Sequence, residues 1–252
     1  MSTTAKMASP AVEVIDLAGV KKRREKGDQV FELHVPEFRI KRGEFISIVG
    51  ESGCGKSTLL DMLGLLLTPT VCQRFHYSVR HPLPGADIER LNAPQLAAIR
   101  RRDMGYVLQS GGLLPFLKVR DNIRLPRRIN GLAPDSAAVT RICDRLGIAG
   151  QLPKLPAFLS GGQRQRVAIA RALAHEPPLV LADEPTAAVD KLTAREIRDT
   201  FKELTAQMGV TVIVVTHDLD LMLPVSDRAF TFELVKASGS HTISTCVEKP
   251  IG

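Results

Sequence analysis

The 252-residue sequence predicts an α/β fold with a mostly parallel core sheet, an N-terminal antiparallel β subdomain and a helical insertion. Short uninterrupted apolar runs, typical of parallel strands buried on both faces, alternate with longer segments of helical periodicity. The chain is long enough to bury a sizeable core, and it contains no internal repeat or low-complexity run. We therefore expect one domain, with a catalytic core over about 12–114 and 156–232.

The apolar run Phe45–Val49 is the first expected core strand, and a glycine-rich loop follows it. The loop fits GxxxxGK(S/T), the pattern of phosphate-binding loops, and consists of Gly50, Glu51, Ser52, Gly53, Cys54, Gly55, Lys56, Ser57 and Thr58. Backbone N–H groups of such a loop converge on phosphates, and a helix expected over 58–67 adds its positive end. Lys56 would reach the β and γ oxygens, and Ser57 would bind Mg²⁺. The pattern predicts a nucleotide triphosphate site.

Cysteine and histidine side chains in and after this loop are candidates for a reactive thiol and for a metal site. Cys54 is interpreted as a small filler residue of the loop, and the alternative is that the backbone amides around it, which favour anions, lower the pKa of its thiol and make it sensitive to alkylation. The segment 71–84 contains Cys72, His76, Tyr77, His81 and two prolines, but no paired ligand spacing, and we predict no metal site there. The four cysteines form no disulfide framework, which suits a reducing cytosol.

The helical insertion is expected at about 115–155, where prolines punctuate the chain. Within it, 135–147 has helical spacing that places four apolar side chains on one side, namely Val139, Ile142, Cys143 and Leu146. Ahead of the insertion, Arg100–Arg102 end another predicted helix, where cations suit the helix dipole.

A second buried strand is expected at Leu179–Ala182, and the carboxylates of Asp183 and Glu184 follow it directly. Asp183 is the candidate Mg²⁺ ligand, and Glu184 is the candidate base that polarises the attacking water. The alternative is that these acids cap the following helix. The phosphate loop upstream favours the metal and base assignment.

Two further side chains follow expected strands. Gln109 ends the run 104–108, and His217 follows the apolar run 210–216. Open α/β sheets bind ligands at the carboxyl ends of their strands, so Gln109 is a candidate for the metal or water shell and His217 for contact with the γ-phosphate. The alternatives are a solvated glutamine and a histidine that caps or packs.

The pentapeptide Leu159–Gln163 reads LSGGQ, and with the preceding motifs and Asp190 it resembles the ATPase subunits of ABC transporters over about 12–232. The resemblance implies an ABC-type P-loop NTPase that binds ATP and Mg²⁺ and dimerises head-to-tail with a second copy. It also implies that five further residues complete the nucleotide site, namely Ser160, Gly161, Gly162, Gln163 and Asp190. Of these, Ser160, Gly161 and Gly162 would contact the γ-phosphate of the ATP that the partner holds. A helix that opens with Ser-Gly-Gly presents free N–H groups to an anion, although an ordinary serine N-cap is the alternative.

Three segments, 61–70, 86–91 and 112–123, further resemble the ATPases of lipoprotein-releasing, macrolide-export and cell-division complexes. That group implies an integral membrane permease subunit on a separate chain, driven by mechanical transmission. Gln109 and the loop Leu113–Val119 would relay the nucleotide state to it. The chain has no run of roughly 18 apolar residues, and 1–10 lacks a signal core. We therefore expect a peripheral protein at the cytoplasmic face of the inner (plasma) membrane.

Other functions remain open on the sequence alone. They are a soluble ABC-type ATPase that acts on nucleic acid or translation, an ATPase of a lipid or solute system with a different permease, and an adaptor without turnover. The net charge of +7 fits anionic lipid or nucleic acid. Basic clusters occur at 21–24, 100–102 and 127–128, but without interleaved aromatic residues, so no specific nucleic acid is expected. The soluble relatives usually carry two cassettes or a coiled-coil insertion, and this chain has neither.

Two features depart from the resemblance, and a third lies outside it. The family usually stacks an aromatic residue on adenine upstream of the phosphate loop, but 20–26 contains none, which leaves Arg23, Arg24 or Phe31 as candidates. The loop before Asp190 also lacks the usual hydroxyl. At the other end, the β-like runs Arg228–Val235 and His241–Glu248 predict a terminal hairpin over about 228–248. The sequence does not reveal the function of this hairpin.

Overall fold

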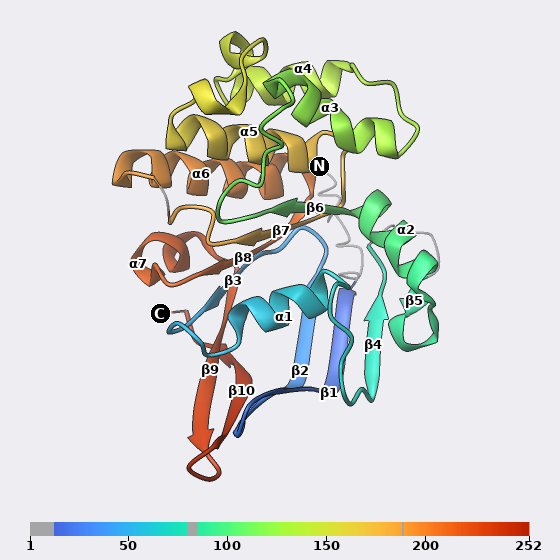
Figure 1. Cartoon of the computed structure of the whole chain (residues 1–252), viewed down its shortest axis with the longest axis vertical. Coiled ribbons are helices and arrows are strands. Elements are labelled where there is room, and N and C mark those ends of the chain that lie inside the picture. Colours follow the sequence, from blue (N-terminus) through green and yellow to red (C-terminus); the bar gives the residue numbers. More distant parts are fainter. Residues whose placement is uncertain (1–12, 80–84, 188, 252) are drawn as a thin grey trace, which may run out of the picture.

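The computed structural model describes residues 13–79, 85–187 and 189–251, and its strands join in one sheet covered by helices (Figure 1). The strands are β1 (Glu13–Lys26), β2 (Gln29–Lys41), β3 (Phe45–Val49), β4 (Arg74–Tyr77), β5 (Ala86–Asp87), β6 (Met104–Val107), β7 (Leu179–Asp183), β8 (Thr211–Thr216), β9 (Arg228–Lys236) and β10 (His241–Lys249). The α-helices are α1 (Lys56–Leu63), α2 (Ala93–Asp103), α3 (Val119–Ile129), α4 (Ala137–Arg145), α5 (Gly161–Leu173), α6 (Lys191–Met208) and α7 (Leu219–Met222). Short 3-10 turns are η1 (Ile88–Arg90), η2 (Ala149–Gln151), η3 (Pro156–Phe158) and η4 (Leu223–Val225).

Among the described residues, the sheet has ten strands in the order β5-β4-β1-β2-β10-β9-β3-β8-β7-β6. Its core is parallel from β9 through β3, β8 and β7 to β6. At the other edge β1 pairs antiparallel with both β2 and β4. The α/β class, the parallel core and the antiparallel N-terminal region are therefore confirmed.

Alternate side chains of the parallel strands divide the apolar core into two layers. In β8, Ile213 and Val215 pack with α1, whereas Val212 and Val214 pack with α5 and α6. Strand β7 alternates in the same way. Burial on both faces explains why these strands are continuously apolar in sequence. Helix α1 thus covers one face of the sheet, and α5 and α6 cover the other (Figure 1).

The expected helical insertion contains α3, α4 and η2, which lie over α5 (Figure 1). Helix α4 and its C-cap residue Leu146 bury the four apolar side chains that the spacing predicted. Asn122 of α3 is fully buried, and its amide bonds to backbone atoms of Leu114, Leu117 and Lys118. This one side chain fixes the conformation of the loop after Gln109.

The prediction of a helix over 58–67 is wrong at both ends, because α1 begins at Lys56 and ends at Leu63. Leu65 has a left-handed φ of 56°, and the N–H groups of Leu65 and Leu66 bond back to Met62 and Asp61. This Schellman-type ending stops the helix although the sequence stays apolar. No helix within the described ranges is long and apolar enough to span a bilayer.

Gly105 of β6 marks a close approach between the sheet and α5. A Cβ atom at this position would lie 2.4 Å from the carbonyl oxygen of Ala172. We expect Gly105→Ala to lower the free energy of unfolding by about 2–4 kcal/mol, because the added methyl group would push the backbone of β6 and α5 apart. Urea unfolding tests this, with Gly150→Ala as the control, since nothing lies within 4 Å of a Cβ at Gly150. Equal stability of the two variants would contradict the close packing.

Candidate functional site

The phosphate-type loop joins the carboxyl end of β3 to the start of α1. Gly53 and Gly55 have left-handed φ angles of 82° and 112°, which glycine adopts without strain. The Lys56 ammonium is buried and donates to the carbonyl oxygens of Gly50 (2.7 Å) and Glu51 (2.8 Å). The loop therefore holds its cation at its centre, where phosphate oxygens would meet it.

Asp183 lies at the end of β7 with a buried carboxylate oxygen, Oδ1, that has no hydrogen-bond partner among the described residues. Burial raises the pKa of this carboxyl, and the nearby charges of Glu184 and Asp61 raise it further, whereas Lys56 opposes the shift. An unpaired buried carboxylate is costly unless a cation neutralises it. The carboxylate of Asp183 and the hydroxyl of Ser57, which is exposed at the start of α1, form a ligand set that suits Mg²⁺. Mg²⁺ usually binds to only one or two protein side chains when substrate phosphates supply the other ligands.

Glu184 has a left-handed φ of 45°, unusual for a residue with a side chain. Its N–H bonds to Val215 O (2.9 Å), which fixes it beside β8. Its Oε2 lies 2.8 Å from Nδ1 of His217. Strained backbone of this kind is found where a side chain must be held in one direction. The structure thus brings together the carboxylate and the histidine that the sequence singled out separately.

Gln109 follows β6, in which Val107 pairs with Ala182 of β7. Because β6 and β7 run parallel, Gln109 follows β6 at the same edge of the sheet at which Glu184 follows β7. The side chain of Gln109 is exposed. The register therefore places Gln109 at the same edge of the sheet as the acidic pair.

Asp61 and Tyr106 also lie at this site, although no sequence motif contains them. Burial raises the pKa of Asp61, and the charge of Arg24 and a hydrogen bond from Tyr106 lower it. Asp61 also contributes to the shift at Asp183. The available signal was helical spacing, because Asp61 lies one turn after Ser57 and so shares its side of α1.

The LSGGQ segment lies elsewhere, at the start of α5. Ser160 caps this helix through a reciprocal pair with Gln163, in which Ser160 Oγ accepts from Gln163 N (3.2 Å) and Gln163 Oε1 accepts from Ser160 N (3.0 Å). A Cβ at Gly162 would meet Thr193 of α6 at 2.8 Å. Within the described residues no hydrogen bond joins 160–163 to the loop 50–58. The exposed Ser160 faces outward with the free end of its helix.

Asp190 caps the neighbouring helix, α6. One carboxylate oxygen accepts from the N–H groups of Leu192 and Thr193, both at 3.0 Å, and the other accepts from Thr193 Oγ1. The bonds from Thr193 hold the pKa of Asp190 below its usual value. The start of α6 and the LSGGQ turn thus form one continuous surface.

Three expectations from the sequence need correction or restriction. The lowered pKa of Cys54 is wrong, because its thiol is buried and burial raises the pKa. Arg127 is not a surface cation, since it is buried and bonds to the carbonyls of Ala133 and Ala174. His81 and the prolines near it lie outside the described residues. His76 pairs with Asp87 (2.9 Å), and Cys72 donates to Glu89.

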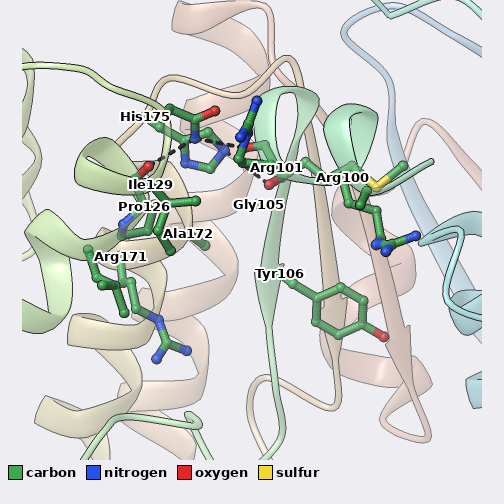
Figure 2. A pocket seen from close by; sticks show the side chains of 13 residues that line it. Arg100, Arg101, Gly105, Tyr106, Pro126, Ile129, Arg171, Ala172 and His175 are labelled. Carbon is green, nitrogen blue, oxygen red and sulfur yellow. Dashed lines mark hydrogen bonds between the residues drawn. The ribbon is translucent and has the colours of Figure 1, made fainter. Parts of the chain in front are cut away.

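A cleft of about 450 Å³ lies between α2 and β6 on one side and α3 and α5 on the other (Figure 2). Figure 2 shows Pro126 and Ile129 opposite Arg100 and Arg101. Arg171, which also lines the cleft, donates to the carbonyl oxygens of Gly111 (2.8 Å) and Gly112 (2.6 Å). Arg171 therefore joins the cleft, the loop after Gln109 and the helix that starts at the LSGGQ turn.

Comparisons with known proteins agree with this geometry. The signature of the family described as "ABC transporter" matches residues 33–187. The lipoprotein-releasing system ATP-binding protein LolD of Shewanella denitrificans is 41% identical, over 75% of this chain and 79% of LolD. The macrolide export ATP-binding/permease protein MacB of Nitrosomonas europaea is 41% identical over 82% of this chain, which spans only 31% of MacB. A dimeric post-hydrolysis structure of the ATP-binding cassette MJ0796, bound to ADP and phosphate, superposes with a TM-score of 0.73 at 33% identity, over 86% of this chain and 93% of that chain.

Proposed function

The chain belongs to the ABC transporter family as an ATPase cassette, and we propose that it works as an ATP-dependent homodimer that powers a separate membrane subunit. The main support for the proposal is that the residues expected to bind ATP lie on two separate surfaces of the chain. Lys56, Asp183 and Glu184 gather at one edge of the sheet, whereas Ser160 opens α5 on another surface. A second copy arranged head-to-tail would bring its LSGGQ turn to this ATP. Two ATP molecules would then lie in one interface, in keeping with the dimeric MJ0796 cassette.

The proposed chemistry follows from the residues at the sheet edge. The loop 50–58 and Lys56 hold the phosphates, and Ser57 and Asp183, with Gln109, hold Mg²⁺, which neutralises phosphate charge when bound. Glu184 accepts a proton from water as the water oxygen bonds to the γ-phosphorus and the bond to ADP breaks. The 2.8 Å contact with His217 holds the Glu184 carboxylate in position.

The cleft in Figure 2 is the proposed docking site for the membrane subunit. It combines apolar side chains with arginines, which suits a short permease helix that carries apolar and acidic residues. Ile129 beside it is 54% exposed, and Phe116 in the loop after Gln109 is 75% exposed. Through Arg171 the cleft contacts the loop after Gln109, so occupancy of the cleft and the nucleotide state would influence each other. By likeness to LolD and MacB, the work would be lipoprotein release, export or mechanical transmission from the cytoplasmic face of the inner membrane.

Photo-crosslinking tests the docking site. We expect benzoylphenylalanine at Ile129 to crosslink to an integral membrane protein in native membranes when ATP is present. The same residue at Val235 of β9, which is 59% exposed, should not, because Figure 1 shows β9 and β10 at the opposite end of the molecule from α3. Crosslinks to ribosomal or DNA-bound proteins alone would instead favour the soluble class of ABC ATPases.

A further inference from the structure

The terminal hairpin of β9 and β10 packs directly against the phosphate loop. Strand β10 pairs in parallel with β2 from His241 to Thr245, and in this register Ser244 lies opposite Leu33. Directly opposite residues of neighbouring strands point to the same face of a sheet. That face is turned toward the phosphate loop, because a methyl carbon of Leu33 lies 3.3 Å from where a Cβ of Gly55 would be. The side chain of Ser244 therefore points at the loop.

Ser244 places a hydroxyl in an apolar part of this face. Its side chain is fully buried, and its neighbours Leu33, across the strands, and Cys246, two residues along β10, are buried as well. A buried hydroxyl costs free energy unless it forms a hydrogen bond. The Ser244 hydroxyl donates to the carbonyl oxygen of Cys54, in the middle of the loop. This bond satisfies the hydroxyl and ties the hairpin to the loop.

The bond also sets the direction of the peptide group between Cys54 and Gly55. In a planar trans peptide the carbonyl oxygen and the N–H point in opposite directions. Because the Cys54 carbonyl points at the hairpin, the Gly55 N–H points away from it. Among the described residues this N–H forms no hydrogen bond, although Gly55 stands at the start of α1. The N–H is therefore free to donate to a phosphate oxygen.

The backbone at Gly55 does not hold this direction by itself. Gly55 has a φ of 112°, and glycine adopts positive and negative φ about equally readily. Reversal of the peptide group is therefore cheap for the loop alone, and it would turn the Cys54 carbonyl oxygen toward the phosphates in place of the N–H. Reversal would also break the bond from Ser244. That bond thus favours the orientation that can bind an anion.

We propose that Ser244 is a positioning residue for phosphate binding, which keeps the Gly55 N–H directed at the triphosphate. The inference rests on the proposed function, since it needs ATP phosphates in the loop. Ser244 acts only through the Cys54 carbonyl and does not touch the nucleotide. The terminal hairpin would then support the nucleotide site from outside the loop.

Calorimetry with ATP and with tripolyphosphate tests this role. In Ser244→Ala we expect both affinities to fall on the order of 5- to 10-fold, because the hydrogen bond that orients the loop is lost. The KM for ATP should rise by a similar factor while kcat at saturating ATP stays within about twofold, since the hydroxyl does not contact the reacting atoms. Ser244→Thr keeps the hydroxyl and should restore both affinities.

Ser47→Ala is the matched control. Ser47 of β3 is equally buried in the same sheet, but its hydroxyl bonds to the hydroxyl of Ser226 (2.6 Å) and not to the loop. The two alanine variants should lose similar stability in thermal unfolding, which also verifies that both are folded. Only Ser244→Ala should lose affinity for the two ligands.

Wild-type affinity for both ligands in Ser244→Ala would overturn the inference, and so would an equal loss in Ser47→Ala. A loss of ATP affinity without a loss of tripolyphosphate affinity would also overturn it, because the effect would then lie at the nucleoside. Failure of the proposed function looks different, since the wild-type chain would then bind neither ATP nor tripolyphosphate.

Discussion

Glu184→Gln is expected to lower ATP turnover on the order of 100- to 10,000-fold while ATP binding is retained. The amide cannot accept the proton of the attacking water, but it keeps the size of the carboxylate and can still bond to His217. With ATP bound and not consumed, the variant should accumulate as a dimer. Steady-state phosphate release measures the turnover, and sedimentation with ATP measures the dimer.

Lys56→Ala is the contrasting variant. It removes the ammonium at the centre of the phosphate loop, so it should lose ATP affinity and never reach the dimer. Near wild-type turnover in Glu184→Gln would show that another group serves as the base. If Glu184→Gln bound no ATP, Glu184 would instead have a role in holding the nucleotide.

Local patterns in the sequence were sufficient for much of this site. Strand β3 begins and ends where its apolar run does, and β7 extends only one residue past its run, to Asp183, because strands buried on both faces leave a continuous signal. The loop 50–58 and the pair Asp183 and Glu184 were recognised because each motif lies on consecutive residues. The end of α1 was missed because a left-handed leucine, rather than the usual glycine, stops the helix.

Long-range register was not predictable in the same way. No local sequence pattern predicts that β10 pairs in parallel with β2, and yet this pairing places the hairpin against the phosphate loop. The approach of Asp61 to Asp183 likewise depends on how α1 packs across β7. From the sequence, Arg23 and Arg24 were equal candidates to stack on the adenine base, whereas the register of β1 against β2 places Arg23 beside Glu32 and Arg24 beside Phe31, on opposite faces of the sheet.

Ser160→Arg is expected to abolish ATP-driven dimerisation while leaving ATP binding to the monomer intact. Ser160 is exposed at the start of α5, and its own chain brings no phosphate loop to it. In the proposed dimer it would meet the partner's γ-phosphate, and a large side chain there would separate the two surfaces. Sedimentation in the Glu184→Gln background isolates this effect, because that background does not consume ATP. ATPase activity of the single variant should fall at least about 100-fold, since hydrolysis would need both copies.

The substitution also removes a helix cap, which by itself should cost about 1 kcal/mol of folding free energy. Ser136→Arg is the matched control, because Ser136 caps α4 by accepting from Val139 N (3.2 Å) and lies outside the proposed interface. The control should lose similar stability yet dimerise and hydrolyse ATP normally. If Ser160→Arg weakened ATP binding to the monomer as strongly as dimerisation, the LSGGQ turn would contact the nucleotide of its own chain. The division of the site between two copies would then be wrong.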